Sequence, residues 1–265
     1  MIAAVILLGF AVLYLAVLCP WHKPSRRIVP GQYAHRGLHD AKSAENSMEA
    51  FEKAVKYGYG IELDVRLSLD GEVVVFHDDT LLRACGKPER VDTHSLAELK
   101  DMTIFKTACH IPEFSKVLEM VNGRVPLIVE IKTGGKRKEL CEKTAKILEN
   151  YSGAYCVESF DPRIVLWFKK NAPDILRGQL SKNFLREKEP GMPLPLAVLL
   201  TGMLINFLTR PDFVAYQLSD KRDIPFALCR FLFREPAAAW TVRSLKEEKQ
   251  TKKFFDAIIF ENFRP

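Results

Sequence analysis

Ionisable side chains recur near the ends of four predicted strands: His35, Arg36, Glu62, Asp64, His77, Glu130 and Lys132. On the strand predicted at residues 61–69, Glu62 and Asp64 share one face, while the apolar residues between them share the other. Converging carboxylates are costly to bury without compensation, and their oxygens suit calcium, magnesium or manganese. The set predicts a divalent-metal site that assists attack on a phosphate ester.

The elements that must position these groups alternate between strands and helices, which predicts right-handed β-α-β units and a parallel sheet. Barrel enzymes place their sites at the carboxyl ends of such strands, and a closed (β/α)8 barrel is the predicted fold. An open doubly wound sheet is the alternative, weakened because no glycine-rich phosphate loop follows the first strand. Nine strands are predicted where a barrel needs eight: 33–36, 61–69, 73–78, 126–132, 154–160, 175–180, 213–218, 237–242 and 256–260.

The helices predicted between the strands follow from apolar spacing and capping residues. They lie at residues 45–58 (with Ser43 as the cap), 95–100, 111–121, 139–151, 162–171 and 244–253. Residues 192–208 form an unusually apolar segment. A second membrane span there would pull the strands at 175–180 and 213–218 apart, so we expect a cover helix that rests against the bilayer.

Composition excludes some function classes. The 265 residues are 48% hydrophobic and 27% charged, as in a folded globular protein. The net charge of +6 comes without basic runs interleaved with aromatic residues, so no nucleic-acid partner is expected. The six cysteines form no zinc pattern, and their scatter favours reduced thiols in a cytosolic domain over three disulfides.

The amino terminus carries an apolar run. Residues 2–19 contain no charge and would span about 27 Å as a helix, close to the hydrocarbon thickness of a bilayer. A signal peptide would need a basic residue before this run and a small-residue cleavage site after it. We therefore predict a transmembrane anchor at 1–20 and a basic linker at 21–31. Lys23, Arg26 and Arg27 then place the following domain on the cytoplasmic side of the cell membrane.

Several short motifs together resemble those of the glycerophosphodiester phosphodiesterase family. They are His35-Arg36-Gly37, Glu45-Asn46-Ser47, Glu62-x-Asp64-Val65, Asp70-Gly71, His77-Asp78, Glu130-Ile131-Lys132, Glu158-Ser159-Phe160-Asp161, Trp240-Thr241-Val242 and the closing run at 256–262. The resemblance spans residues 32–265 and implies one catalytic domain there. It implies a (β/α)8 TIM barrel of the phosphatidylinositol-phosphodiesterase-like type, preceded here by the single transmembrane helix.

The resemblance also implies an activity and a set of roles. The family cleaves glycerophosphodiesters to sn-glycerol 3-phosphate and an alcohol, in glycerophospholipid breakdown. By resemblance, Glu62, Asp64 and Glu130 bind a divalent cation, Ca²⁺ or Mg²⁺, and His35 and His77 act as the acid–base pair. The remaining implied roles are phosphate or substrate binding for Arg36, Lys132 and Trp240, and support of the cluster for Glu45 and Asn46.

Two other functions stay open at this point. A lysophospholipase D-like activity on lysophospholipids would use the same site, and the apolar segment 192–208 favours it. A non-catalytic, membrane-tethered binding protein is the other reading, although the sequence retains all the catalytic positions that the resemblance identifies. No obligate protein partner is expected.

Overall fold

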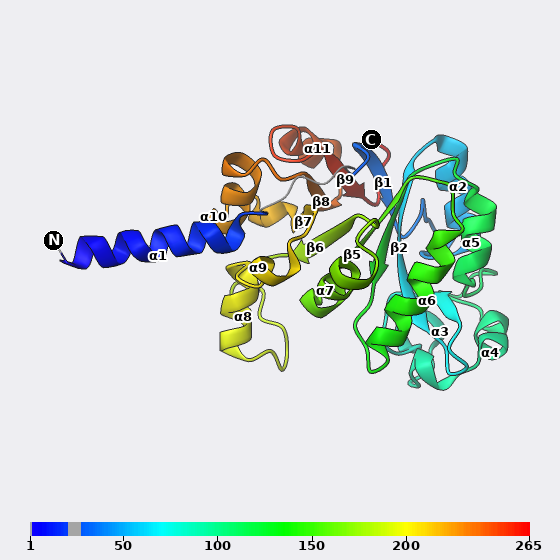
Figure 1. Cartoon of the computed structure of the whole chain (residues 1–265). Helices are drawn as coiled ribbons and strands as arrows, with labels where there is room; N and C mark the ends of the chain where they lie inside the picture. Colours follow the sequence, from blue (N-terminus) through cyan, green and yellow to red (C-terminus); the bar gives the residue numbers. More distant parts are fainter. Residues whose placement is uncertain (1, 21–27) are drawn as a thin grey trace.

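Eight parallel strands close into a barrel in the computed structural model, which describes residues 2–20 and 28–265 (Figure 1). The sheet order runs from β1 through β9, β8, β7, β6, β5 and β4 to β2, and a further β1–β2 pairing closes the circle. The closed barrel is confirmed, and the open sheet is wrong. The barrel strands are β1 (Gly31–His35), β2 (Gly60–Leu67), β4 (Leu127–Ile131), β5 (Tyr155–Ser159), β6 (Arg177–Ser181), β7 (Phe213–Gln217), β8 (Ala237–Val242) and β9 (Ala257–Phe260).

The ninth predicted strand is an addition to the barrel. The short β3 (Val73–Val75) pairs antiparallel with the end of β2, with Val65 opposite Val75. The chain reverses between them at Asp70-Gly71, where Gly71 has a φ of 80° that favours glycine. Because β2 pairs with β4 only as far as Val65, its last two residues extend past the barrel rim.

Helices cover the outside of the barrel. The longer ones are α2 (Met48–Tyr57), α5 (Phe114–Val121), α6 (Arg137–Glu149), α7 (Pro162–Asn171) and α11 (Leu245–Thr251). Ser47, rather than the predicted Ser43, caps α2, because its hydroxyl accepts a hydrogen bond from Ala50 N. The shorter helices are α3 (Leu82–Cys85), α4 (Leu96–Asp101), α10 (Ile224–Ala227), the 3₁₀ turns η1 (Val91–Thr93) and η2 (Leu218–Asp220), and the π-helical η3 (Leu228–Leu232).

Two of the three clusters of buried apolar residues follow the predicted faces of the barrel strands. Ile61, Leu63 and Val65 of β2 pack outward with helix residues such as Phe51 and Phe114. A second cluster includes Tyr33, Ile128, Cys156, Phe213 and Ala215, one or two from each of several strands. The face of β2 opposite its apolar residues therefore carries Glu62 and Asp64 into the barrel, as the alternation predicts.

The amino-terminal helix departs from the sequence prediction. Helix α1 (Ile2–Leu18) has 17 residues and projects from the barrel (Figure 1). Within residues 2–20 and 28–265, no helix combines the length and the apolar character needed to cross a membrane. The predicted transmembrane span at 1–20 is therefore not found: the prediction counted 18 residues, whereas α1 ends before Cys19 and Pro20. Residues 21–27, most of the predicted basic linker, lie outside the described residues.

The end of α1 is held against the barrel. Tyr14 donates a hydrogen bond from its hydroxyl to Gly202 O over 3.1 Å. The Arg210 guanidinium donates to the carbonyls of Ala16, Val17 and Cys19 at the end of α1. These hydrogen bonds hold the carboxyl end of α1 against the segment that contains Gly202 and Arg210.

The apolar segment 192–208 is not one cover helix. It folds into α8 (Leu194–Thr201) and α9 (Asn206–Thr209), separated by a turn at Gly202 and Met203. Met203 has a φ of 52°, which interrupts a continuous helix. The predicted contact of this segment with a bilayer stays a prediction.

Gly178 on β6 provides a test of the barrel packing. A Cβ at this position would lie 2.2 Å from Cζ of Phe213, a ring that is fully buried between β6 and its neighbours. We expect Gly178→Ala to lower the free energy of unfolding by about 2–3 kcal/mol. Gly134→Ala is the matched control, because a Cβ there meets no atom within 4 Å. Denaturant unfolding measures both, and equal stability of the two variants would contradict the packing.

Candidate active site

Three carboxylates meet inside the barrel. Glu62 and Asp64 come from β2 and Glu130 from β4, and one oxygen of each lies within 4.8 Å of the others. Register explains the meeting, because Asp64 and Glu130 are opposite one another in adjacent parallel strands. Glu158, buried on β5, is opposite Glu130 on its other side. Burial and the charges of Asp64 and Glu130 raise the pKa of Glu62 well above its usual range.

Cationic side chains offset part of this charge. Lys132 Nζ lies 2.7 Å from Glu130 Oε1 and 3.3 Å from Asp64 Oδ1. Arg36 Nε lies 3.3 Å from Asp64 Oδ2, and Asn46 Nδ2 donates to the same oxygen over 2.8 Å. Burial raises the pKa of Asp64, but Lys132, His77 and Arg36 outweigh it and hold that pKa well below its usual value.

The carboxylate set fits a divalent cation. Asp64 Oδ1 is buried and accepts no hydrogen bond in the described part of the chain, so a lone pair is left for a ligand. A cation would also remove the repulsion that raises the pKa of Glu62. Three carboxylate oxygens suit calcium or magnesium, and their geometry does not select between these two. Glu62, Asp64 and Glu130 are therefore the candidate metal ligands, as the resemblance implies.

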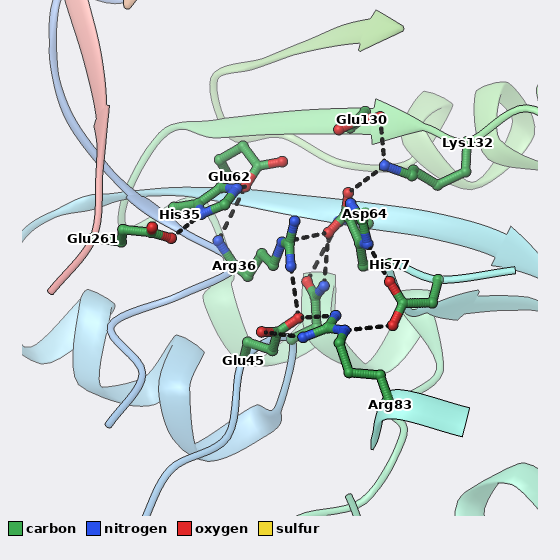
Figure 2. A network of polar contacts seen from close by, with 12 residues as sticks. His35, Arg36, Glu45, Glu62, Asp64, His77, Arg83, Glu130, Lys132 and Glu261 are labelled. Carbon is green, nitrogen blue, oxygen red and sulfur yellow. Dashed lines mark hydrogen bonds and ion pairs between the residues drawn. The ribbon is translucent and has the colours of Figure 1, made fainter. Parts of the chain in front are cut away.

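His35 stands at the end of β1 with a carboxylate behind it. Its Nδ1 lies 2.6 Å from Glu261 Oε2, and its Nε2 lies 4.0 Å from Glu62 Oε2 (Figure 2). Because a carboxylate only accepts, Nδ1 carries the proton and Nε2 is left for the metal side of the site. The hydrogen bond from His35 lowers the pKa of Glu261 to about 2 despite its partial burial.

His77 follows β3 and is oriented in the same way. Its Nδ1 lies 2.6 Å from Asp78 Oδ1, and Arg83 Nε donates to the other oxygen of Asp78 over 2.6 Å. Partial burial raises the pKa of Asp78, but the hydrogen bonds from His77 and Arg83 lower it more, so the carboxylate stays ionised. Asp78 thus fixes the ring and the tautomer of His77.

Arg36, Glu45 and Arg83 link the two histidines. Arg36 donates from Nη1 to Glu45 Oε1 over 2.7 Å, and its backbone N–H donates to Glu62 Oε2 over 3.0 Å. Arg83 donates to both oxygens of Glu45. Arg36 and Asn46 have φ values of 54° and 56°, a left-handed conformation that is uncommon outside glycine and recurs at functional sites. Glu45 therefore contacts Arg36 and Asn46 contacts Asp64, in keeping with their predicted supporting role.

Trp240 lies apart from this polar network. Its ring packs edge-on against Phe160 with centroids 5.3 Å apart, and no hydrogen bond of its buried Nε1 lies within the described residues. Its predicted contact with substrate stays a prediction. Three partners in the network had no predicted role: Arg83, Glu158 and Glu261. Glu158 and Glu261 belong to motifs quoted above and lie near the ends of strands, and this position could have identified them as site residues. Nothing in the sequence marked Arg83.

Comparison with known proteins identifies the family to which this barrel, with its acidic and histidine-bearing centre, belongs. The model of the glycerophosphoryl diester phosphodiesterase family matches residues 35–215. The chain belongs to this family. A glycerophosphodiester phosphodiesterase of Caldanaerobacter subterraneus subsp. tengcongensis is 34% identical over 159 residues, which cover 56% of this chain and 65% of the relative. One from Bacillus altitudinis is 30% identical over 169 residues, 59% of this chain and 69% of the relative.

A solved structure shares the fold. An Oleispira antarctica phosphodiesterase in complex with the product sn-glycerol-3-phosphate superimposes with a TM-score of 0.71 at 22% identity. The match covers 88% of this chain and 93% of that one. The chain thus matches the solved barrel over nearly its full length, and about two thirds of the length of the two sequence relatives.

Metal binding at the carboxylates has a direct thermal test. Saturating Mg²⁺ or Ca²⁺ should raise the melting temperature of the wild-type chain by several degrees, because a ligand of the folded state stabilises it by about 2.7 kcal/mol at a hundred times its Kd. Asp64→Asn should abolish most of that shift. Glu142→Gln, an exposed carboxylate on α6, is the control and should retain it. An undiminished shift in Asp64→Asn would place the cation elsewhere.

Proposed function

We propose that this protein hydrolyses glycerophosphodiesters to sn-glycerol 3-phosphate and an alcohol. The observation that carries the proposal is the pair of carboxylate-oriented histidines, His35 and His77, beside the cluster of Glu62, Asp64 and Glu130. Membership of the glycerophosphoryl diester phosphodiesterase family supports the substrate class.

Each histidine can exchange a proton at one defined atom. With Nδ1–H donated to Glu261 or Asp78, Nε2 of each ring is the atom that accepts or donates in the reaction. One histidine takes the proton of the glycerol 2-hydroxyl as that oxygen attacks phosphorus. The other gives a proton to the departing alcohol, and the resulting cyclic phosphate is then opened by water.

The charged residues around the histidines have complementary tasks. A bound cation would draw electron density from the phosphate oxygens and neutralise charge that builds up on them. Lys132 and Arg36 border the same carboxylates, so a phosphate held there meets an ammonium and a guanidinium. Arg83 and Glu45 hold Arg36 and Asp78 in place, which keeps both ends of the site in fixed relation.

Replacement of the histidines tests the reaction. His35→Ala and His77→Ala should each lower kcat/KM for glycerophosphocholine by about 10²–10⁴-fold, the usual contribution of a positioned acid or base. The measurement is choline release with added metal. His110→Ala, an exposed histidine outside the network, should stay within about twofold of wild type. Near-wild-type turnover in either active-site variant would remove that histidine from the mechanism.

We further propose that α1 attaches the protein to the cell membrane, with the barrel on the cytoplasmic side. Leu7, Leu8 and Phe10 of α1 are each more than 60% exposed, an apolar surface suited to lipid. The basic residues at 23–27 support attachment to an anionic leaflet, and all six cysteines are unpaired, as in a reducing compartment.

Vesicle flotation tests this attachment. Phe10→Lys should reduce binding of the full chain to vesicles of phosphatidylcholine and phosphatidylglycerol by about tenfold or more, because a phenylalanine side chain contributes about 1.5–3 kcal/mol when it leaves water. Leu82→Lys is the control, since Leu82 is similarly exposed, 58% against 66%, but lies on α3 (Figure 1). Equal binding of wild type and Phe10→Lys would reject α1 as the attachment.

A further inference from the structure

Arg243 is a further charged residue at the barrel mouth, and it contacts the carboxylate behind His35. Its Nε donates to Glu261 Oε1 over 2.6 Å. The other oxygen of Glu261, Oε2, lies 2.6 Å from His35 Nδ1 (Figure 2). The carboxylate of Glu261 therefore bridges an arginine and a histidine, with one oxygen for each.

The ends of two neighbouring strands bring Arg243 and Glu261 together. Arg243 directly follows β8, and Glu261 directly follows β9. Val242 and Phe260, the last residues of these strands, are opposite one another, and Glu261 N donates to Val242 O over 3.0 Å. The backbone N–H of Arg243 donates to Glu247 Oε2 over 2.6 Å, in the first turn of α11. Hydrogen bonds therefore hold the backbone on both sides of the ion pair.

The side chain of Glu261 needs a second contact more than that of Asp78 does. Asp78 directly follows His77 in the chain, so the backbone already places its carboxylate beside the ring. Glu261 reaches His35 from another strand, through a side chain with one more rotatable bond. Fixing a glutamate side chain costs up to about 1.5–2 kcal/mol of rotamer freedom. The hydrogen bond with His35 offsets part of this cost, and the ion pair with Arg243 adds a second contact.

His77 has a matching arrangement. An arginine Nε, here that of Arg83, donates over 2.6 Å to the far oxygen of the carboxylate that contacts the ring. That arginine also donates to both oxygens of Glu45. Within the described part of the chain, the side chain of Arg243 donates only to the carboxylate behind His35. A substitution of Arg243 therefore perturbs one histidine and leaves the network around the other intact.

The ion pair of Arg243 adds little to the stability of the fold. The Arg243 side chain is 56% exposed, and an exposed ion pair contributes about 0–1 kcal/mol. The side chains of Glu261 and His35 are only 14% and 17% exposed. An exposed arginine that binds a largely buried carboxylate beside the site is better suited to fix geometry than to stabilise the barrel.

We propose that Arg243 is a positioning residue for His35. By binding Oε1 of Glu261, it keeps Oε2 on Nδ1 of His35, and so keeps Nε2 of that ring as the atom that exchanges a proton. The inference rests on the proposed hydrolysis and adds a residue to the machinery of the same site. The residues proposed to hold phosphate, Arg36 and Lys132, have other partners, so substrate binding does not depend on Arg243.

Arg243→Ala tests this role through the split between kcat and KM. With glycerophosphocholine and added metal, kcat should fall about 10–100-fold, since a misplacement of about 1 Å at a catalytic group can cost 10²-fold. KM should stay within about twofold, because the phosphate-binding groups are retained. Arg90→Ala is the matched control and should leave both unchanged. Arg90 is 46% exposed and has an ion pair with Asp92 at 2.9 Å, away from both histidines.

A double-mutant cycle determines whether Arg243 acts through His35. When it is added to His35→Ala, the Arg243→Ala change should alter kcat by less than about twofold, because the ring that it positions is already gone. The melting temperature should fall by no more than a few degrees, as expected for an exposed ion pair. Wild-type kcat in Arg243→Ala, or an equal loss in the wild-type and His35→Ala backgrounds, would overturn the positioning role.

The ring of His35 also gives a readout that does not need turnover. The full chain is labelled with ¹⁵N-histidine, and its ring nitrogens are observed by NMR at a pH where the rings are neutral, with His35→Ala to assign the signals. Arg243→Ala should shift the His35 nitrogens from the Nδ1–H tautomer towards a mixture of tautomers, and Arg90→Ala should not. An unchanged His35 spectrum in Arg243→Ala would overturn the inference and leave the diesterase function intact. A shifted spectrum without hydrolysis under Mg²⁺ or Ca²⁺ would overturn the proposed function and support the positioning of the ring.

Discussion

The burial of several carboxylates in one small volume is the constraint that shapes the rest of the site. Glu62, Asp64, Glu130 and Glu158 are each less than 10% exposed, and adjacent parallel strands hold them in register. Such a cluster would destabilise the barrel without positive charge close by. Lys132 and Arg36 supply part of that charge, and a divalent cation bound at the three convergent oxygens would supply the remainder.

The same constraint explains why the loops around the barrel mouth carry so many ion pairs. Arg36 can offset Asp64 only while Glu45 and the backbone hold its guanidinium in place. Arg83 then ties Glu45 to Asp78, so the residue that orients His77 is fixed by the network that also holds Arg36. A carboxylate accepts a hydrogen bond from Nδ1 of each histidine, so Nε2 is the ring nitrogen left to exchange a proton. The fixed carboxylates therefore determine the tautomer of each ring.

Sequence reasoning predicted the parts that depend on local pattern. Alternation along 61–69 placed Glu62 and Asp64 on the inner face, because side-chain direction on a strand has a period of two. It left open which of the nine strands was surplus, since the antiparallel pairing of β3 depends on a tertiary contact with β2. The partner of His35 was also out of reach, because Glu261 is 226 residues away in the chain. The segment 192–208 was predicted as one helix because apolar composition does not reveal the turn after Thr201.

The cleft beside Glu130 and Lys132 is lined by both charged and apolar side chains. An ion pair such as Lys132 with Glu130 is weak in water, and its strength grows as the surrounding dielectric falls. Leu196 and Leu200 of α8 and the ring of Phe160 line the same cavity as Lys132, so an apolar group held there would displace water beside this ion pair. An apolar group in this part of the cavity would thus strengthen the ion pair between Lys132 and Glu130. This coupling gives a physical reason for an otherwise costly arrangement, in which partly exposed leucines lie next to a charged cluster.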